Sequence, residues 1–150
     1  MNTPASKALL RVESVGQTFD TKRGPFIALR DIDLHIHPGE VVALIGHSGC
    51  GKSTLLNLIS GLTRPSEGVL ICNGREIAGP GPERAMVFQN HSLLPWLTCA
   101  QNVMLAVEQV FGRKEGKAKL KVRVADALEM VHMTHAADKY PAEISGGMKQ

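Results

Sequence analysis

The sequence contains no apolar run long enough to cross a bilayer as a helix. A membrane-spanning helix needs about 18 or more consecutive apolar residues, and polar or charged residues interrupt every apolar stretch of the 150-residue chain sooner than that. Aromatic residues are also scarce, with four Phe, one Trp and one Tyr. The sequence therefore predicts no membrane-spanning helix, and its interior has to be built mainly from aliphatic side chains.

Cysteine is scarce too, and its three positions, Cys50, Cys72 and Cys99, are widely spaced. An odd number of dispersed cysteines indicates free thiols in a reducing cytoplasm rather than a disulfide framework. Two interpretations of Cys50 stay open. One is a reactive thiol whose pKa is lowered by a helix N-terminus, and the favoured one is a small residue tolerated in a tight loop.

A strong excess of charge of one sign is missing as well. The chain has 17 Lys and Arg against 14 Asp and Glu, a net charge of +3, which gives no argument for a nucleic-acid partner. Six of the basic residues gather between residues 113 and 123, where a solvated helix face is favoured over a binding patch. With 43% hydrophobic residues, the chain can form one globular domain with its own core.

Residues 46–54 read Gly-His-Ser-Gly-Cys-Gly-Lys-Ser-Thr and match the phosphate-binding loop pattern G-x-x-x-x-G-K-[ST] in full. Residues 40–45, just before, form a short apolar and β-branched run that is typical of a buried parallel strand, and residues 53–59 have helical character. Strand, glycine-rich turn and helix in this order are the context that such a loop requires. The alternative is a glycine-rich turn that opens an ordinary helix.

The residue types in this loop explain the predicted chemistry. Its glycines allow backbone angles that a Cβ would block, so that successive amides can curl around a phosphate. The helix that begins near Lys52 turns its positive dipole end toward the same anion. Lys52 would place a charge on the β- and γ-phosphates, and the Ser53 hydroxyl would hold Mg²⁺ with Thr54 close by. The predicted ligand is a nucleoside triphosphate with its metal.

Outside the loop, strand patterns dominate as far as residue 88, and helical patterns follow. Alternation and short apolar runs predict four further strands, over residues 10–15, 32–37, 68–72 and 84–88. Helical periodicity covers residues 100–111 and 118–133, and Tyr140-Pro141 interrupts it. The predicted fold class is α/β, with a mostly parallel sheet that carries the phosphate loop, an N-terminal antiparallel β part and a helical subdomain.

A second glycine-rich turn follows the helical stretch, at Ile144-Ser145-Gly146-Gly147-Met148. A Ser-Gly-Gly turn about to start a helix offers another anion-binding end, but alone it is a weak signal because it occurs in many loops. Its position is more informative, since Ser145 follows Lys52 by 93 residues with a helical insert between them.

This combination resembles the ATP-binding cassette (ABC) transporter ATPases, in which a Walker A loop and a Leu-Ser-Gly-Gly-Gln signature flank a helical subdomain. The resemblance covers about residues 9–150. It implies one partial ABC ATPase domain over residues 1–150, with a RecA-like and antiparallel β core at about 9–89, a helical subdomain at about 98–143 and the signature at 144–150. It also implies a head-to-tail dimer in which each signature contacts the γ-phosphate held by the partner's Walker A loop.

The family positions carried over to this sequence include several beyond the phosphate loop. Phe19 matches the aromatic residue that stacks on adenine, followed by a loop up to Phe26 that is longer than a hairpin turn; the alternative is a core strand residue. Gln89 matches the Q-loop glutamine that reaches Mg²⁺ and the attacking water, and an exposed loop amide is its alternative. The implied nucleotide-binding residues are Phe19, Gly46, His47, Ser48, Gly49, Cys50, Gly51, Lys52, Ser53, Thr54, Ser145, Gly146 and Gly147.

The resemblance also implies partners and a location. The loop that starts at Leu93 and ends at Thr98 exposes a Trp and several Leu, which suggests a partner surface; in the family this region receives the coupling helix of a membrane permease. The other implied partner is a second ATPase subunit, and no nucleic acid is expected. The implied place is the cytoplasmic face of the cell membrane, as a peripheral subunit.

Further resemblance points toward one branch of the family. Residues 45–51, 79–84 and 87–90 look like the nitrate/sulfonate/taurine importers, and His47, His132 and the Ile-Ser-Gly-Gly-Met signature lean toward the nitrate or cyanate members. In the signature, Met148 stands where Gln is usual and Ile144 where Leu is usual. No residue here would touch the transported solute, so the nitrate assignment rests on resemblance only.

One family element has no counterpart in the 150 residues. A Walker B strand that ends in Asp-Glu, and a switch histidine after it, should follow the signature, and no Asp or Glu in the chain lies in such a setting. The sequence therefore leaves two hypotheses. One is an importer ATPase whose isolated 150-residue chain is hydrolytically inactive, and the other is a non-catalytic truncated cassette that binds nucleotide weakly or not at all. A soluble ABC protein of translation or DNA repair is disfavoured, because basic extensions for nucleic acid are missing.

Overall fold

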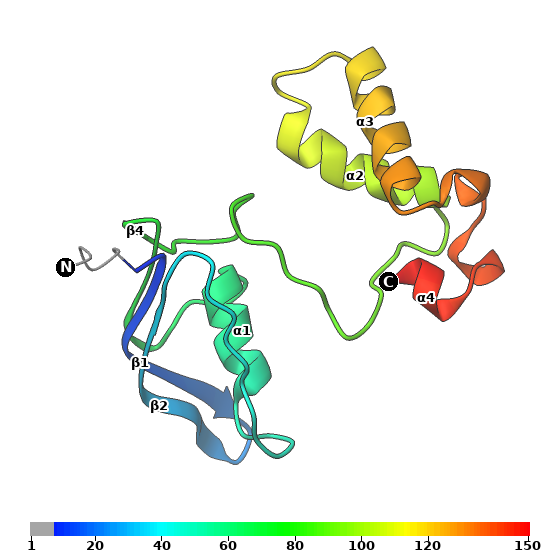
Figure 1. Ribbon diagram of the computed structural model, residues 1–150. Coiled ribbons are helices and arrows are strands. Elements are labelled where there is room, and N and C mark those ends of the chain that lie inside the picture. The colour runs from blue at the N-terminus through cyan, green and yellow to red at the C-terminus, as the bar shows by residue number, and fades with distance from the viewer. Residues whose placement is uncertain (1–7) are drawn as a thin grey trace. The chain divides into compact units, whose positions relative to one another are not determined.

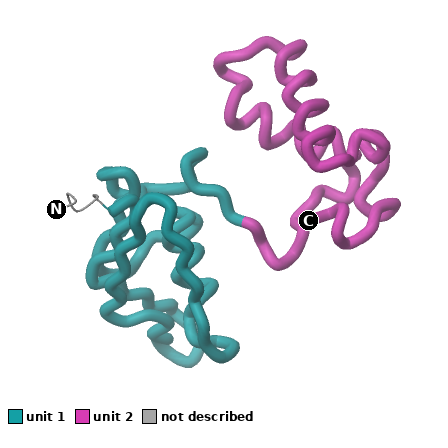
Figure 2. Tube along the Cα trace, in the orientation of Figure 1, with its two compact units in different colours: residues 1–86 teal, residues 87–150 magenta. Residues whose placement is uncertain are grey.

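The computed structural model describes residues 8–150. The chain divides into two compact units, residues 1–86 and 87–150, shown in teal and magenta in Figure 2. Within the described residues, no helix has the length and apolar character that a membrane crossing requires.

The first unit is built on a four-stranded antiparallel sheet with strand order β2-β1-β3-β4 (Figure 1). The strands are β1 (Leu10–Thr21), β2 (Gly24–Ile36), β3 (Glu67–Cys72) and β4 (Arg75–Glu76). Three of the strands predicted from alternation lie in β1, β2 and β3. The turn between β3 and β4 is the Asn73-Gly74 pair, whose φ values of 51° and 75° suit a tight hairpin turn of the type that this dipeptide favours.

Helix α1 (Lys52–Ser60) covers this sheet and closes the core of the first unit (Figure 1). Its apolar positions Leu55 and Leu58 are buried, as the i, i+3 spacing predicts. They pack among aliphatic side chains from all parts of the unit, and the buried cluster contains Leu10, Val12, Val15, Leu29, Leu55, Leu58, Leu70, Cys72 and Ile77. The C-terminal end of the sheet-facing helix is fixed by Gly61, whose φ of 79° closes the helix in the left-handed conformation.

The described residues do not form the parallel strand predicted over residues 40–45 or the short strand predicted over residues 84–88. Both segments lack strand pairing, and Val41, Ile45 and Val87 are 96%, 94% and 77% exposed. A parallel strand buried on both faces needs neighbouring strands to pair its backbone groups and layers to cover its side chains. No described segment pairs with residues 40–45. This run therefore remains exposed to solvent, although it has the composition of a buried strand.

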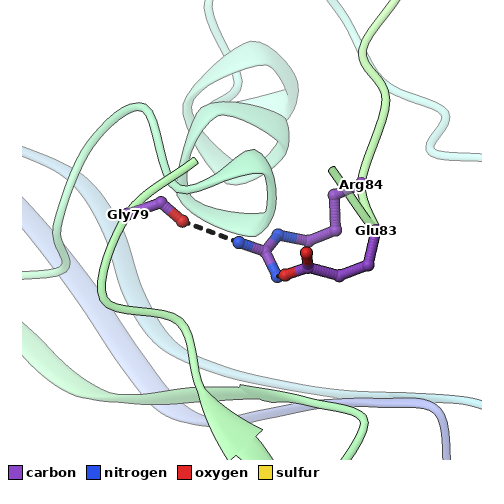
Figure 3. A network of polar contacts seen from close by, with 3 residues as sticks. All are labelled: Gly79, Glu83 and Arg84. Carbon is purple, nitrogen blue, oxygen red and sulfur yellow. Dashed lines mark hydrogen bonds and ion pairs between the residues drawn. The ribbon is translucent and has the colours of Figure 1, made fainter. Parts of the chain in front are cut away.

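The loop at residues 79–84 is closed by polar contacts and packs against the end of α1. The Arg84 guanidinium donates a hydrogen bond to the carbonyl oxygen of Gly79 at 2.7 Å and forms an ion pair with Glu83 (Figure 3). Its side chain is only 12% exposed. The turn expected from Gly79-Pro80-Gly81-Pro82 is therefore an ordered loop held by a mostly buried arginine.

The second unit is helical. It contains α2 (Cys99–Phe111), α3 (Lys117–Met130), the short 3₁₀ turns η1 (Thr134–Ala136) and η2 (Pro141–Glu143), and α4 (Gly146–Lys149). Helix α2 begins with a full capping box, because Thr98 accepts from the Gln101 amide while the Gln101 side chain accepts from the Thr98 amide. The second predicted helix ends three residues early, and His132 just beyond it has a φ of 58°.

Candidate functional site

The glycine-rich loop forms an exposed turn that leads directly into α1. Gly49 and Gly51 have φ values of 80° and 95°, which side chains with a Cβ rarely adopt. Gly51 is also the N-cap of α1, and a Cβ there would lie 2.9 Å from the carbonyl oxygen of Ala28. Glycine at this position therefore lets the loop lie directly against strand β2, with the free amides of the helix start facing outward.

The Lys52 side chain folds back over this loop. Its ammonium group donates to the carbonyl oxygens of Gly46 at 2.7 Å and His47 at 2.8 Å, and lies 3.3 Å from the Cys50 sulfur. The lysine charge thus lies against the loop, close to the N-terminus of α1. A positive charge, free helix amides and a glycine turn in one place form an arrangement suited to an anion.

The remaining loop residues are open to solvent. Residues 46–50 are exposed, and so is Ser53 on the first turn of α1, while Thr54 is half-buried. Cys50 is the exposed one of the three free cysteines, whereas Cys72 and Cys99 are buried. The loop is therefore accessible to a ligand from outside along its whole length.

The signature segment begins a helix in the second unit. The Ser145 hydroxyl caps α4 by accepting from the Met148 amide at 3.3 Å, and Gly146 and Gly147 form the first turn. A Cβ at either glycine would meet no atom within 4 Å, so space is left open above this turn. The segment lies beside an apolar cavity of about 760 Å³ that is lined by Leu93, Val103, Leu128, Ile144 and Met148 among others.

The structure has a shorter connection after Phe19 than was expected. Strands β1 and β2 continue to a two-residue turn at Lys22-Arg23, so the predicted longer loop between Phe19 and Phe26 does not exist. Phe19 instead pairs with Phe26 across the hairpin, and both rings are half-exposed, at 38% and 55%. An extended strand pairing satisfies the backbone of this segment, and it leaves the Phe19 ring on an open surface.

Gln89 lies in the second unit, in an irregular and exposed segment. The strand predicted over residues 84–88, just before Gln89, is not formed in the structure. The candidate residues thus separate between the two units, with Phe19 and residues 46–54 in the first and Gln89 and the signature in the second.

The candidate partner loop at residues 93–98 is held by a residue that the sequence reasoning missed. The Asn102 side chain accepts from the Leu94 amide at 2.8 Å, and its amide group donates to the carbonyl oxygens of Leu94 and Leu97. Trp96 remains 68% exposed on the loop so anchored. An Asn within the first turn of a helix that follows a Pro-containing loop is the signal that could have indicated this anchor.

A sequence model described as ABC transporter matches residues 29–150, which is most of the chain. The chain belongs to the ABC transporter family. Cassettes of this family contain a phosphate loop followed by a signature, and the predicted fold family is confirmed.

Curated members of the family are similar over nearly the whole chain. The nitrate transport protein NasD of Klebsiella oxytoca is 60% identical over 144 residues, 96% of this chain and 55% of the relative. The nitrate import ATP-binding protein NrtC of Synechococcus elongatus is 53% identical over 94% of this chain and 21% of its own. The bicarbonate transport ATP-binding protein CmpD of the same species is 47% identical over 99% and 53%. The chain thus spans about half the length of NasD and CmpD.

Solved ABC cassettes have the same fold. A dimeric post-hydrolysis state of the cassette MJ0796, bound to ADP and Pi, matches with a TM-score of 0.80 and 27% identity. The alignment covers 93% of this chain and 65% of that one. A second dimeric structure of the same bacterial cassette matches equally well.

Proposed function

We propose that this chain is the ATP-binding part of an ABC importer ATPase, which couples ATP binding and hydrolysis to uptake of a small anion such as nitrate. The observation that carries the proposal is the loop at residues 46–54, where Lys52 lies over a glycine turn at the start of α1. Family membership and the names of the relatives, which concern nitrate and bicarbonate transport, support it.

The loop fits the triphosphate of ATP. The glycine turn and the first turn of α1 supply outward amides for the phosphate oxygens. The Lys52 ammonium now rests on the carbonyl oxygens of Gly46 and His47, two neutral acceptors. A β- or γ-phosphate would be a stronger partner, because charge-assisted hydrogen bonds are about twice as strong as neutral ones. Lys52 would therefore exchange these carbonyls for phosphate when the nucleotide binds.

Mg²⁺ would arrive with the nucleotide. The described residues contain no cluster of three or more His, Cys, Asp or Glu side chains that could hold a metal ion. The exposed Ser53 hydroxyl, beside Lys52, is the protein ligand that fits, since Mg²⁺ is usually bound through few protein oxygens together with phosphates and water. Gln89 is the second proposed ligand, and it would also orient the attacking water.

The remaining steps need residues from a second copy and a pair of carboxylates in a Walker B setting. Ser145, Gly146 and Gly147 would contact the γ-phosphate bound to the Walker A loop of a second ATPase subunit. None of the chain's carboxylates lies in the setting of a Walker B Asp-Glu, so we expect negligible hydrolysis by the 150-residue chain alone. In the importer, the subunit would lie at the cytoplasmic face of the membrane.

The proposed permease contact is the loop at residues 93–98. Trp96 is 68% exposed there, and the Asn102 anchor holds the loop backbone, so the apolar side chains are presented on an ordered segment. Such a surface suits an apolar helix of a membrane subunit. No nucleic-acid partner is proposed.

A second candidate is a non-catalytic cassette that binds nucleotide weakly or not at all. The exposed apolar segment at residues 40–45 favours it, because this segment leads into the phosphate loop and no described strand supports it. A loop on an unsupported segment would have to be ordered by the ligand, which lowers affinity.

Calorimetric titration of the folded chain with ATP and Mg²⁺ separates these candidates. We expect saturable heat, which a Lys52→Ala variant reduces at least about tenfold in affinity, since a hydrogen bond to a charged group contributes about 1.5–3 kcal/mol. A Lys22→Ala variant on the β1–β2 turn is the matched control and should bind normally. Absence of heat, or equal binding by the Lys52 variant, would contradict the proposal. Lys52-dependent phosphate release by the chain would contradict the expected lack of hydrolysis.

A further inference from the structure

The positive charge of this protein is concentrated at one place. Residues 113–123 contain six Lys and Arg and one Glu, a net charge of +5. The other residues contain eleven Lys and Arg against thirteen Asp and Glu, a net charge of −2. The whole excess of positive charge therefore lies in eleven consecutive residues, which follow the end of α2, form most of the connecting loop and begin α3 (Figure 1).

The single carboxylate in this segment is already engaged. Glu115 accepts two hydrogen bonds from Arg123, both at 2.6 Å, and the Arg123 guanidinium also lies 3.9 Å from the centre of the Phe111 ring. This contact lowers the pKa of Glu115, so the pair stays ionised and neutralises itself. It also ties the last residue of α2 and the loop to the second turn of α3, which orders the connection.

Five cations remain, and none of them lies at ion-pair distance from a carboxylate in the described residues. Arg113, Lys114, Lys117, Lys119 and Lys121 are all exposed, and none forms an ion pair with any residue in the described part of the chain. Apolar side chains are exposed among them. Val110, on the last turn of α2, is 47% exposed, and Val122, one turn after Lys119 on α3, is 58% exposed.

We propose that this basic tip, residues 110–123, binds the surface of a bilayer that contains anionic phospholipid. Clusters of four to eight Lys and Arg on a helix are attracted to anionic headgroups, each residue contributing about 1 kcal/mol or a factor of about five in binding. Val110 and Val122, both about half-exposed, would enter the headgroup region, as apolar residues of interfacial helices do. The proposal goes beyond the proposed nucleotide site, none of whose residues lies in the tip.

A bilayer fits this surface better than a nucleic acid does. Single-stranded nucleic acids are bound by basic grooves with aromatic rings on which bases stack. The one ring of the tip, Phe111, is covered by Arg123, and the exposed apolar residues are aliphatic. Aliphatic side chains between lysines suit a lipid interface, whereas they offer no face for a base.

Vesicle cosedimentation of the full chain tests the proposal. We expect binding to vesicles of equal parts phosphatidylglycerol and phosphatidylcholine, no binding to phosphatidylcholine alone, and release as ionic strength rises. The triple variant Lys114→Gln, Lys117→Gln, Lys119→Gln should lower the partition coefficient by about 100-fold, from a factor of about five per charge. Gln keeps the helix propensity close to that of Lys.

The matched control removes three charges from the first unit, as Lys22→Gln, Arg23→Gln, Arg30→Gln. This variant has the same net charge as the tip variant. Its partition coefficient should stay within about threefold of that of the unsubstituted chain, because a change of this size is smaller than the factor of about five for one contacting charge. Equal losses in the two variants would overturn the proposal, because general charge would then explain binding. It would also be overturned if the chain failed to bind phosphatidylglycerol vesicles, or if it bound a poly(U) oligonucleotide and not the vesicles. Circular dichroism of both variants checks that the helices are intact.

Discussion

Gly61, at the end of α1, lies in direct contact with Gly79. A Cβ on Gly61 would overlap the carbonyl group of Gly79 and lie 2.9 Å from the Pro80 nitrogen. The same carbonyl oxygen accepts the hydrogen bond from Arg84. The helix that starts at the phosphate loop therefore ends against the loop at residues 79–84, and the missing side chain of Gly61 makes this contact possible.

Replacing Gly61 by Ala should destabilise the first unit. The substitution places a Cβ at a φ of 79° and against backbone atoms that no rotamer change can move. Each effect costs about 1–3 kcal/mol, so we expect the free energy of unfolding in urea to fall by about 2 kcal/mol or more. Gly147→Ala is the control, since a Cβ there meets nothing within 4 Å. An unchanged midpoint for Gly61→Ala would show that the contact is absent in solution.

Cys50 should be the thiol that reacts first. It is exposed in the phosphate loop, while Cys72 and Cys99 are buried in the cores of the two units. Brief treatment of the folded chain with a maleimide should modify one cysteine, which peptide mass spectrometry would locate at position 50. Reaction requires access to the sulfur, so ATP with Mg²⁺ bound over the loop should slow it.

The Cys50 labelling has its own internal control. Denaturant should make all three cysteines react, which verifies that the other two are protected by burial alone. ATP should have no effect on labelling in a Lys52→Ala variant if that variant has lost nucleotide affinity. Equal labelling rates with and without ATP in the unsubstituted chain would argue against nucleotide over the loop.

The structural elements whose sequence patterns depend on nearby residues were predicted well. The alternation in residues 10–15 and 68–72, the Asn73-Gly74 turn and the periodicity of residues 100–111 all correspond to elements of the structure. In each case the partner that satisfies the pattern lies within the described residues, as β1 does for β2 and β3. Short-range turn chemistry and helix periodicity need little else.

The predictions that differ from the structure concern segments whose pairing partners lie far away in the sequence or cannot be identified from it. Residues 40–45 have the composition of a buried parallel strand, yet composition alone does not supply the neighbouring strands, and the segment is unpaired here. The residues between Phe19 and Phe26 were predicted as a long loop because their pairing depends on register, which a bulged hairpin sets only in three dimensions. The Arg84 contact with Gly79 and the Asn102 anchor join polar groups that no periodicity marks.

The exposed segment at residues 40–45 should limit solubility. Val41 and Ile45 are 96% and 94% exposed, so they contribute almost nothing to packing in this chain, whereas an extended, unpaired apolar segment is a template for association. The double variant Val41→Lys, Ile45→Lys should therefore raise the concentration at which light scattering detects aggregates, with a melting temperature within about 2 °C of the original. Val12→Lys, at a fully buried position, should instead unfold the sheet. If the double variant aggregates at the same concentration as the unsubstituted chain, residues 40–45 are not the surface through which the chains associate.

The ion pair at the basic tip should make the helical unit sensitive to acid. The hydrogen bonds from Arg123, followed by the charges of Arg123 and Lys119, lower the pKa of Glu115 below its usual 4.5. A carboxylate whose pKa is lower in the folded state stabilises that state above the unfolded pKa, and the contribution disappears as the pH falls through the folded value. The stabilisation by this pair should thus be present at pH 7 and decline below about pH 4.5.

Melting temperatures at neutral pH and near pH 3, followed by helical circular dichroism, test this dependence. The unsubstituted chain should lose more thermal stability on acidification than a Glu115→Gln variant, which cannot form the charged pair at either pH. Glu129→Gln, at an exposed position on α3 that makes no ion pair in the described part of the chain, is the control and should follow the unsubstituted chain. If Glu115→Gln and Glu129→Gln respond equally to acid, the Glu115–Arg123 pair does not contribute to the stability of the helical unit.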